Sequence, residues 1–85
     1  MKVIKRDGSL QEFTIDKIIK SIRAASDDIG EPLNESDLHN IAKDIEGEIK
    51  GLGKEEVSFE IIRRMIADTL NREGFKDVAK AYVEY

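Results

Sequence analysis

The sequence predicts an α+β fold that is mostly helical, in which an N-terminal β-hairpin is followed by four helices. An Asp-Gly pair inside residues 2–13 is a strong signal for a tight hairpin turn. Four later stretches place apolar residues at the three- and four-residue spacing of a helix. At 85 residues the chain has the size of one domain, so we expect residues 1–85 to form a single unit.

The hairpin is predicted over residues 2–13. A two-residue loop at Asp7-Gly8 would pair Lys5 with Leu10 and Val3 with Glu12 on one face. The other face would collect the remaining side chains, Ile4, Arg6, Gln11 and Phe13. Neither face is cleanly apolar, which is poor for a core but suits a sheet that holds a ligand on one side.

The first helix is predicted to follow directly. Thr14 is the expected N-cap, and Asp16 lies in the first turn, where the helix dipole favours an acid. Gly30 is the expected stop, with Pro32 just beyond it. The apolar stripe consists of Ile15, Ile18, Ile19, Ile22, Ala25 and Ile29.

The second helix is predicted to start near Asn34 and to end at Gly51-Leu52-Gly53. Leu33 before the cap and Leu38 after it have the spacing of a hydrophobic staple. Its apolar stripe consists of Leu38, Ile41, Ala42, Ile45 and Ile49.

The third and fourth helices complete the prediction. Ser58 is the expected cap of the third helix, with Val57 and Ile62 as a second staple and Gly74 as the stop. The fourth helix is expected from about Phe75, and its apolar pattern runs to Tyr85 without a stop signal. We therefore expect this chain to be the first domain of a longer protein.

Composition excludes several classes of protein. The chain has no Cys, which rules out disulfides, thiolate nucleophiles and Cys-based zinc sites and is compatible with the reducing cytoplasm where we expect it. No apolar run approaches the roughly 20 residues that span a bilayer, so we expect no membrane partner. The net charge of −4 and the scarcity of aromatic residues argue against nucleic acid as a partner.

The sequence shows no recognisable arrangement of catalytic or metal-binding residues. The single His, His39, lies in the second predicted helix without a neighbouring nucleophile, and we expect an ordinary surface or half-buried residue. The 18 carboxylates are scattered along helices, and no metal-ligand spacing occurs. We infer that the domain is not an enzyme by itself and holds no structural metal.

Cations are concentrated at the N-terminus. The first 23 residues carry six Lys and Arg against three Asp and Glu, a net +3, and the chain total of −4 leaves −7 for residues 24–85. Lys5, Arg6 and Lys17 lie near one turn and one helix start, where free N–H groups add positive potential. This favours a local site for a multiply charged anion such as a triphosphate. Apolar contacts to a base would come from Val3 and Ile18, and polar contacts from Gln11 and Thr14.

These residues resemble the ATP-cone, a regulatory nucleotide-binding module at the N-terminus of many ribonucleotide reductases and in a bacterial repressor of reductase genes. The matching segments, in order, are Val3-Ile4-Lys5-Arg6-Asp7-Gly8-Ser9, Phe13, Asp16-Lys17-Ile18, Val57-Ser58 and Val78-Ala79-Lys80-Ala81-Tyr82. The resemblance implies a hairpin or small sheet capped by four helices. It also implies ATP or dATP as the effector, with Mg²⁺ as a compatible companion.

The resemblance assigns roles by position. Val3 and Ile18 would pack on the base, and the three cations Lys5, Arg6 and Lys17 would bind phosphates. Polar contacts would come from Gln11, Thr14 and Ser58. Two positions depart from the family pattern: Gln11 replaces a frequent Glu, and Ile62 stands where some members carry a nucleotide-contacting His.

The repressor branch carries a Cys₄ zinc ribbon before the cone, and this chain has no Cys. The resemblance therefore implies the N-terminus of a reductase, with the anaerobic type as our choice, and the catalytic domain or subunit of that enzyme as the partner. Two alternatives stay open: a degenerate cone that acts only in protein interaction, and a small nucleic-acid binder that uses the basic turn.

Overall fold

The computed structural model describes residues 1–84, which form three strands and four helices. The elements in chain order are β1 (Lys2–Ile4), β2 (Leu10–Glu12), α1 (Ile15–Asp28), α2 (Glu35–Gly51), β3 (Glu56–Ser58), α3 (Phe59–Arg72) and α4 (Lys76–Glu84). The predicted fold class is confirmed, and β3 is an addition to it. Tyr85, to which the pattern of the fourth helix was expected to continue, lies outside the described residues.

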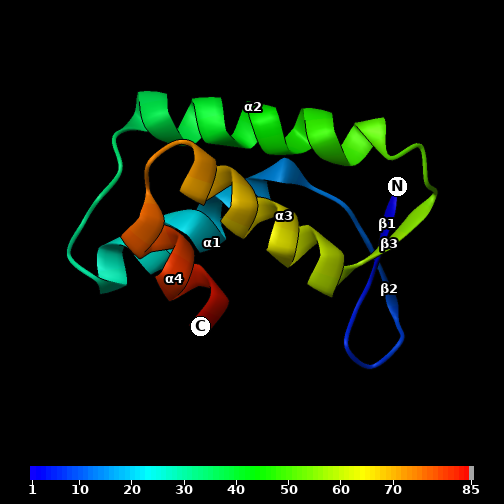
Figure 1. Cartoon of the computed structure of the whole chain (residues 1–85). Coiled ribbons are helices and arrows are strands. Elements are labelled where there is room, and N and C mark those ends of the chain that lie inside the picture. Colours follow the sequence, from blue (N-terminus) through cyan, green and yellow to red (C-terminus); the bar gives the residue numbers. More distant parts are fainter. Residues whose placement is uncertain (85) are drawn as a thin grey trace.

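The sheet has the strand order β2-β1-β3 and lies at one end of the helices (Figure 1). The central strand β1 pairs antiparallel with β2 and parallel with β3. The strand β3 runs directly into α3, and two residues separate β2 from α1. Both α1 and α3 therefore start beside the sheet.

The predicted hairpin register is wrong by one residue. The structure pairs Lys2 with Glu12, Val3 with Gln11 and Ile4 with Leu10. Cross-strand partners share a face of a sheet, so Val3 and Gln11 lie on the same face rather than on opposite faces.

The length of the turn explains the difference. The Lys5 amide donates to the Ser9 carbonyl at 2.8 Å, and the Gly8 amide donates to the Lys5 carbonyl at 2.9 Å, which leaves a three-residue loop. Gly8 takes the positive φ of 86° that this loop requires. The Asp7 carboxylate accepts from the Ser9 hydroxyl and amide, and these bonds hold the pKa of Asp7 below its ordinary value.

Two of the three predicted helix caps are confirmed by hydrogen bonds. The Asn34 side chain accepts from the Asp37 amide at 2.8 Å, and the Ser58 hydroxyl accepts from the Ile61 amide at 3.3 Å. Thr14 occupies the N-cap position of α1, but its side chain makes no capping bond. The fourth helix starts at Lys76, one residue after its predicted start.

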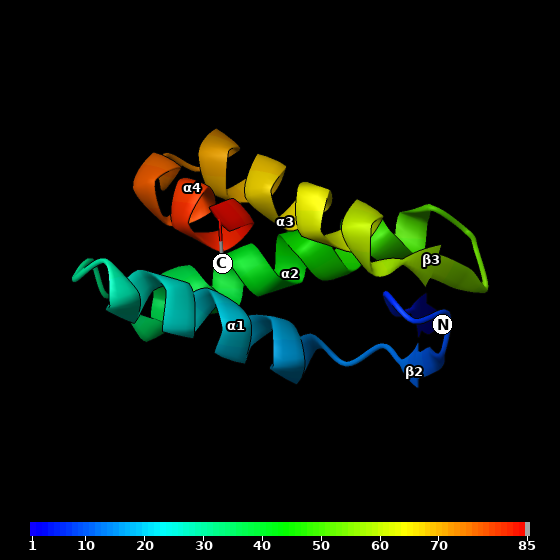
Figure 2. The ribbon, with the colours of Figure 1, turned by 90° about the horizontal axis from the view of Figure 1, so that it is seen from below.

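Helices α1 and α3 lie between the other two helices. The long helix α2 runs along one side of that pair, and α4 packs against both helices from the other side (Figures 1 and 2). Because α4 has nine residues and α1 has 14, the two helices are about 14 Å and 21 Å long. Figure 2 shows α4 at the end away from the sheet, so it leaves the sheet end of α1 and α3 without a covering helix.

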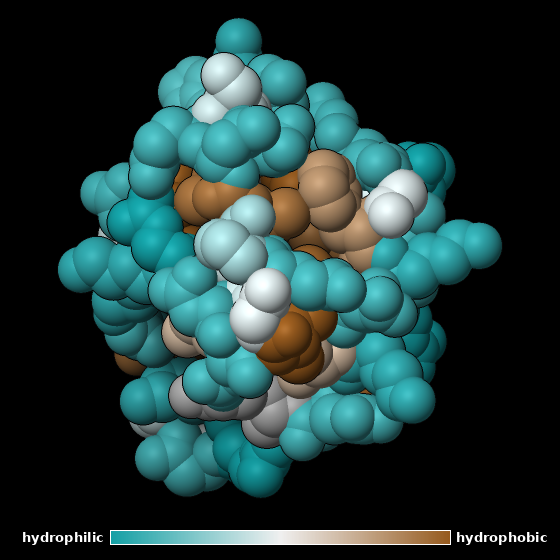
Figure 3. Space-filling view, turned by 90° about the vertical axis from the view of Figure 1, so that its left-hand side faces the viewer, coloured by the Kyte–Doolittle hydropathy of each residue, from teal (hydrophilic) through white to brown (hydrophobic). Residues whose placement is uncertain are grey.

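The core lies between α2 and the other helices. Its fully buried members include Ile22, Leu38, Ile41, Ile45, Ile49, Ile66, Leu70 and Val78. At the end of the molecule opposite the sheet, Figure 3 shows a mainly hydrophilic surface with several hydrophobic patches near its middle. His39 is exposed, as predicted. None of the helices in the described part of the chain is long and apolar enough to cross a membrane.

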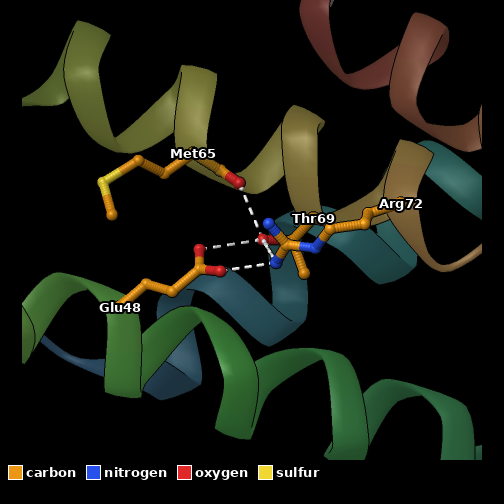
Figure 4. A network of polar contacts seen from close by, with 4 residues as sticks. All are labelled: Glu48, Met65, Thr69 and Arg72. Atoms are coloured by element: carbon orange, nitrogen blue, oxygen red, sulfur yellow. Dashed lines mark hydrogen bonds and ion pairs between the residues drawn. The ribbon is translucent and has the colours of Figure 1, made fainter.

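A polar network closes the interface of α2 with α3 (Figure 4). Thr69 is fully buried, and its hydroxyl lies 2.9 Å from the Met65 carbonyl and 3.2 Å from a Glu48 carboxylate oxygen. Arg72 is exposed and donates to the same Glu48 carboxylate. The buried hydroxyl is therefore satisfied, which removes the cost of placing it in the core.

Candidate functional site

The uncovered stretch between α1 and α3 is a groove with a volume of about 320 Å³. The sheet closes one end and α4 the other. The volume lies at the lower end of the range for small-molecule sites. The groove is lined by Val3, Gln11, Glu12, Phe13, Thr14, Lys17, Ile18, Ser21, Phe59, Ile62, Arg63, Ile66 and Tyr82.

The lining is largely apolar, with polar groups at its edges. Ile18, Ile62 and Ile66 are almost completely buried and come from the facing sides of α1 and α3. Aromatic rings are contributed by Phe59 and Tyr82. This combination suits a flat, partly apolar ligand held in orientation by a few polar contacts.

Six of the nine predicted site residues line this groove. They are Val3, Gln11, Thr14, Lys17, Ile18 and Ile62. They come from β1, β2, the link before α1, α1 itself and α3, so the fold brings together residues up to 59 positions apart in sequence, from Val3 to Ile62. The corrected hairpin register matters here, because it places Gln11 beside Val3 on the face that meets the groove.

The other three predicted residues lie outside the lining. Lys5 is exposed at the start of the hairpin turn. Arg6, in the same turn, places its guanidinium carbon 5.3 Å from the centre of the Phe59 ring, and Phe59 belongs to the groove. The Ser58 hydroxyl is occupied by the α3 cap. Arg6 therefore lies at the rim, whereas Ser58 holds the start of α3.

Sequence reasoning missed one cation of the groove lining, Arg63 on α3, which follows Ile62 directly. Arg63 donates to the carbonyl oxygens of Tyr82 at 3.1 Å and Val83 at 3.0 Å, and its guanidinium carbon lies 5.9 Å from the centre of the Tyr82 ring. The Tyr82 hydroxyl lies 3.2 Å from the Ser21 hydroxyl on α1. The sequence pattern placed Tyr82 in the fourth predicted helix. It could not single out Arg63, because one Arg in a helix with many charged residues has no distinguishing pattern.

The remaining lining residues absent from the prediction are Glu12, Phe13, Ser21, Phe59 and Ile66. Glu12 is the acid among them, and it is ion-paired with Lys2 and with the N-terminal amine at 3.7 Å. The hydrogen bond from Lys2 holds the pKa of Glu12 below its ordinary value. Its negative charge is thus largely balanced before any ligand enters.

The potential of the groove favours anions. Lys17 and Arg63 line it, Arg6 lies at its rim, and the N-termini of α1 and α3 both lie at its sheet end. Among residues 1–84 no three His, Cys, Asp or Glu side chains gather into a metal-binding group. The arrangement can bind and orient a multiply charged ligand, and it offers no pair of carboxylates placed for acid–base work.

A family model and several known proteins match this chain. The family model described as ATP cone domain matches residues 1–85. An anaerobic ribonucleoside-triphosphate reductase of Haemophilus influenzae is 36% identical over 86 residues, which is 98% of this chain and 12% of the reductase.

Transcriptional repressors named NrdR match as well. The repressor of Pediococcus pentosaceus is 35% identical over 68 residues, covering 80% of this chain and 42% of the repressor. That of Limosilactobacillus reuteri is 34% identical over 77 residues, covering 91% of this chain and 47% of the repressor. Relatives of this kind weigh against the expectation that nucleic acid is excluded as a partner. All these proteins are more than twice as long as the segment that they share with this chain.

Because the family model spans residues 1–85 and a reductase relative aligns over nearly the same length, the chain belongs to the ATP-cone family of nucleotide-binding regulatory modules.

Proposed function

We propose that this chain binds ATP or dATP in the groove between α1 and α3 and regulates an attached ribonucleotide reductase. The observation that carries the proposal is the groove itself: an apolar floor beside two helix N-termini, with cations along its length. A nucleoside triphosphate has the matching form, with a flat base at one end and several negative charges at the other.

In this proposal the base packs on Val3, Ile18 and Ile62, which are apolar and line the groove from β1, α1 and α3. Gln11 and Thr14 give the polar contacts to the ribose or base; the Thr14 side chain is not used as a helix cap. Phosphates are bound by Lys17 from within the groove and by Lys5 and Arg6 from the hairpin turn. Arg can hold two phosphate oxygens at once, whereas Lys acts as a point charge.

The partner in this proposal is the catalytic part of a reductase of the anaerobic type. Support comes from the Haemophilus influenzae reductase, which aligns with 98% of this chain, while the chain accounts for only 12% of that protein. Catalysis would then belong to the rest of such a protein, and the cone would be its effector-binding part. The effector would shift the attached enzyme by a coupling free energy of about 1–3 kcal/mol.

The NrdR relatives favour a second candidate, in which the same nucleotide site serves a transcriptional regulator. The site and its ligand are the same in both candidates; the partner differs. The third reading, a degenerate cone that acts only in protein interaction, predicts that no nucleotide binds at all.

Thermal unfolding of the chain with ATP, dATP and Mg²⁺ tests the proposal. A ligand present at about 100 times its Kd stabilises the fold by about 2.7 kcal/mol, which is a shift of at least about 10 °C for a domain of this size. The double variant Lys5→Ala, Arg6→Ala should lose the shift and keep its helical circular dichroism. The matched control is Lys43→Ala, Lys76→Ala, which removes two exposed cations away from the groove.

No shift with millimolar nucleotide would overturn the proposal and favour the interaction module. A shift that the Lys5, Arg6 variant retains in full would keep nucleotide binding but move the phosphate site away from the hairpin turn.

A further inference from the structure

Arg63 connects the groove with the end of α4. It is half-buried, it lines the groove from α3, and its Nη2 atom donates to two successive carbonyls in the last turn of α4. The last four carbonyls of a helix have no partner within the helix, so an Arg at this position acts as a C-terminal cap. Tyr82, whose carbonyl it binds, is also the wall that closes the groove.

The last turn of α4 depends on such contacts. A nine-residue helix is too short to be stable alone in water. Besides Arg63, the contact of the Tyr82 hydroxyl with Ser21 at 3.2 Å holds this turn against α1. Val83, in contrast, is 55% exposed and adds little burial.

The same guanidinium is a strong ligand for phosphate. A hydrogen bond from a cation to an anionic oxygen is about twice as strong as one between neutral groups, and Arg tends to grip phosphate with two parallel N–H bonds. Both carbonyl bonds come from the single atom Nη2, which has two N–H groups, so a two-pronged phosphate contact through the Nη edge would take at least one of these N–H groups away from α4.

We propose that Arg63 exchanges partners when a polyanion fills the groove, leaving the Tyr82 and Val83 carbonyls and loosening the last turn of α4. The inference rests on the proposed function, because it takes a nucleoside triphosphate as the occupant. In this proposal the end of α4 is bound to Arg63 when the groove is empty and loses this contact when a ligand fills the groove.

Solution NMR of the 85-residue chain, titrated with ATP and Mg²⁺, tests this exchange. We expect the carbonyl ¹³C signals of Tyr82 and Val83 to shift with the same saturation curve as the methyl signals of Ile18 in the groove. Backbone order parameters of residues 82–84 should fall from near 0.85, typical of rigid backbone, to below about 0.6.

Two variants separate Arg63 from a general effect of charge. In Arg63→Gln the end of α4 should already be loose without ATP and should not change further, and ATP affinity should fall about tenfold. Arg72→Gln is the matched control, because it removes an Arg from the same helix whose partner is Glu48 on α2; it should behave like the parent chain.

The outcomes distinguish the two proposals. If ATP shifts the Ile18 methyls while the α4 carbonyls stay in place or residues 82–84 become more rigid, the exchange is wrong and the nucleotide site stands. If ATP changes no groove signal, the proposed function fails, and the exchange fails with it.

Discussion

The two sides of α3 differ in what covers them. On the side of α2, Thr69 and Leu70 are fully buried, and the polar network of Figure 4 satisfies the one hydroxyl in the interface. On the other side, Ile62 and Ile66 face a groove of about 320 Å³ that α4 covers only in part. The two sides of α3 differ because the helices that pack on them differ in length: α2 has 17 residues and α4 has nine.

Because of this difference, we expect residues on the α2 side of α3 to determine stability and residues on the groove side to determine ligand binding. Side chains toward α2 are packed on all sides, so their removal leaves a cavity. Side chains such as Ile62 and Ile66 are themselves buried, but they border a volume that a ligand can fill. Substitutions on the two sides should therefore change different measurements.

The largest expected effect is on the closed side. Ile45 on α2 is fully buried, and Ile45→Ala should lower the free energy of unfolding by about 2–5 kcal/mol, because it creates a cavity in a tight core. Chemical denaturation measures it. Ile61→Ala, which removes the same atoms from a side chain that is 48% exposed, is the control and should stay within about 0.5 kcal/mol. Equal losses in the two variants would contradict this view of the core.

Next is an effect on binding at the open side. Lys17→Gln should weaken ATP about tenfold, which corresponds to about 1.4 kcal/mol, and leave the melting temperature without ligand almost unchanged. Calorimetric titration measures the affinity. Lys20→Gln, an exposed position on the same helix outside the groove, should bind like the parent chain. Unaltered affinity in Lys17→Gln would remove Lys17 from the site.

A smaller effect is expected in the network between α2 and α3. Thr69→Val keeps the shape of the side chain but deletes the hydroxyl that contacts Met65 and Glu48, so it should cost about 1 kcal/mol in urea unfolding. Thr69→Ser keeps the hydroxyl and loses a buried methyl group. ATP affinity should be the same in both variants, and a change in it would show that the two sides of α3 are coupled.

The smallest effect depends on pH. Partial desolvation, and then the nearby Asp44 carboxylate, raise the pKa of Glu73 above its ordinary value, and Glu73 occupies the C-cap position of α3, where the helix dipole disfavours an acid. The stability that its protonated form contributes is present below the unfolded-state pKa and is lost as pH rises through the folded-state pKa.

Glu73→Gln should therefore raise the melting temperature at pH 7 by a few degrees, consistent with about 0.3–1 kcal/mol for a charge at a helix end, and should make no difference near pH 3. Glu60→Gln, at the favourable N-terminal end of the same helix, should act in the opposite direction at pH 7. Thermal scans between pH 3 and 7 measure both. An equal gain at both pH values would show that the ionised carboxylate is not the cause.

Much of the fold could be predicted because its signals are local. Helix stripes, the Asn34 and Ser58 caps and the Asp7-Gly8 turn each depend on neighbours within a few residues. The register was wrong because an Asp-Gly pair marks a turn without fixing its length, which here depends on the Asp7–Ser9 bonds. The strand β3 was missed because three residues show no periodicity and their partner is distant in sequence.

The site shows the same limit. Six of the nine residues named from the sequence line the groove, since they belong to a recognisable pattern around the hairpin and α1. Arg63 and Phe59 became visible only when α3 was placed beside α1, because their role comes from the packing of helices. The titrations described above test whether these nine residues bind a nucleotide.

The parallel pairing of β1 with β3 has a consequence for how the chain folds. It joins Lys2 to Glu56, 54 residues apart, while the β1–β2 hairpin closes over a few residues. Contacts between distant residues form late, because a long loop must close first. During synthesis the hairpin and α1 emerge early, but the groove has no second wall until α3 leaves the ribosome. A chain interrupted before residue 59 would carry most of the recognisable motif and still have nowhere to place a ligand.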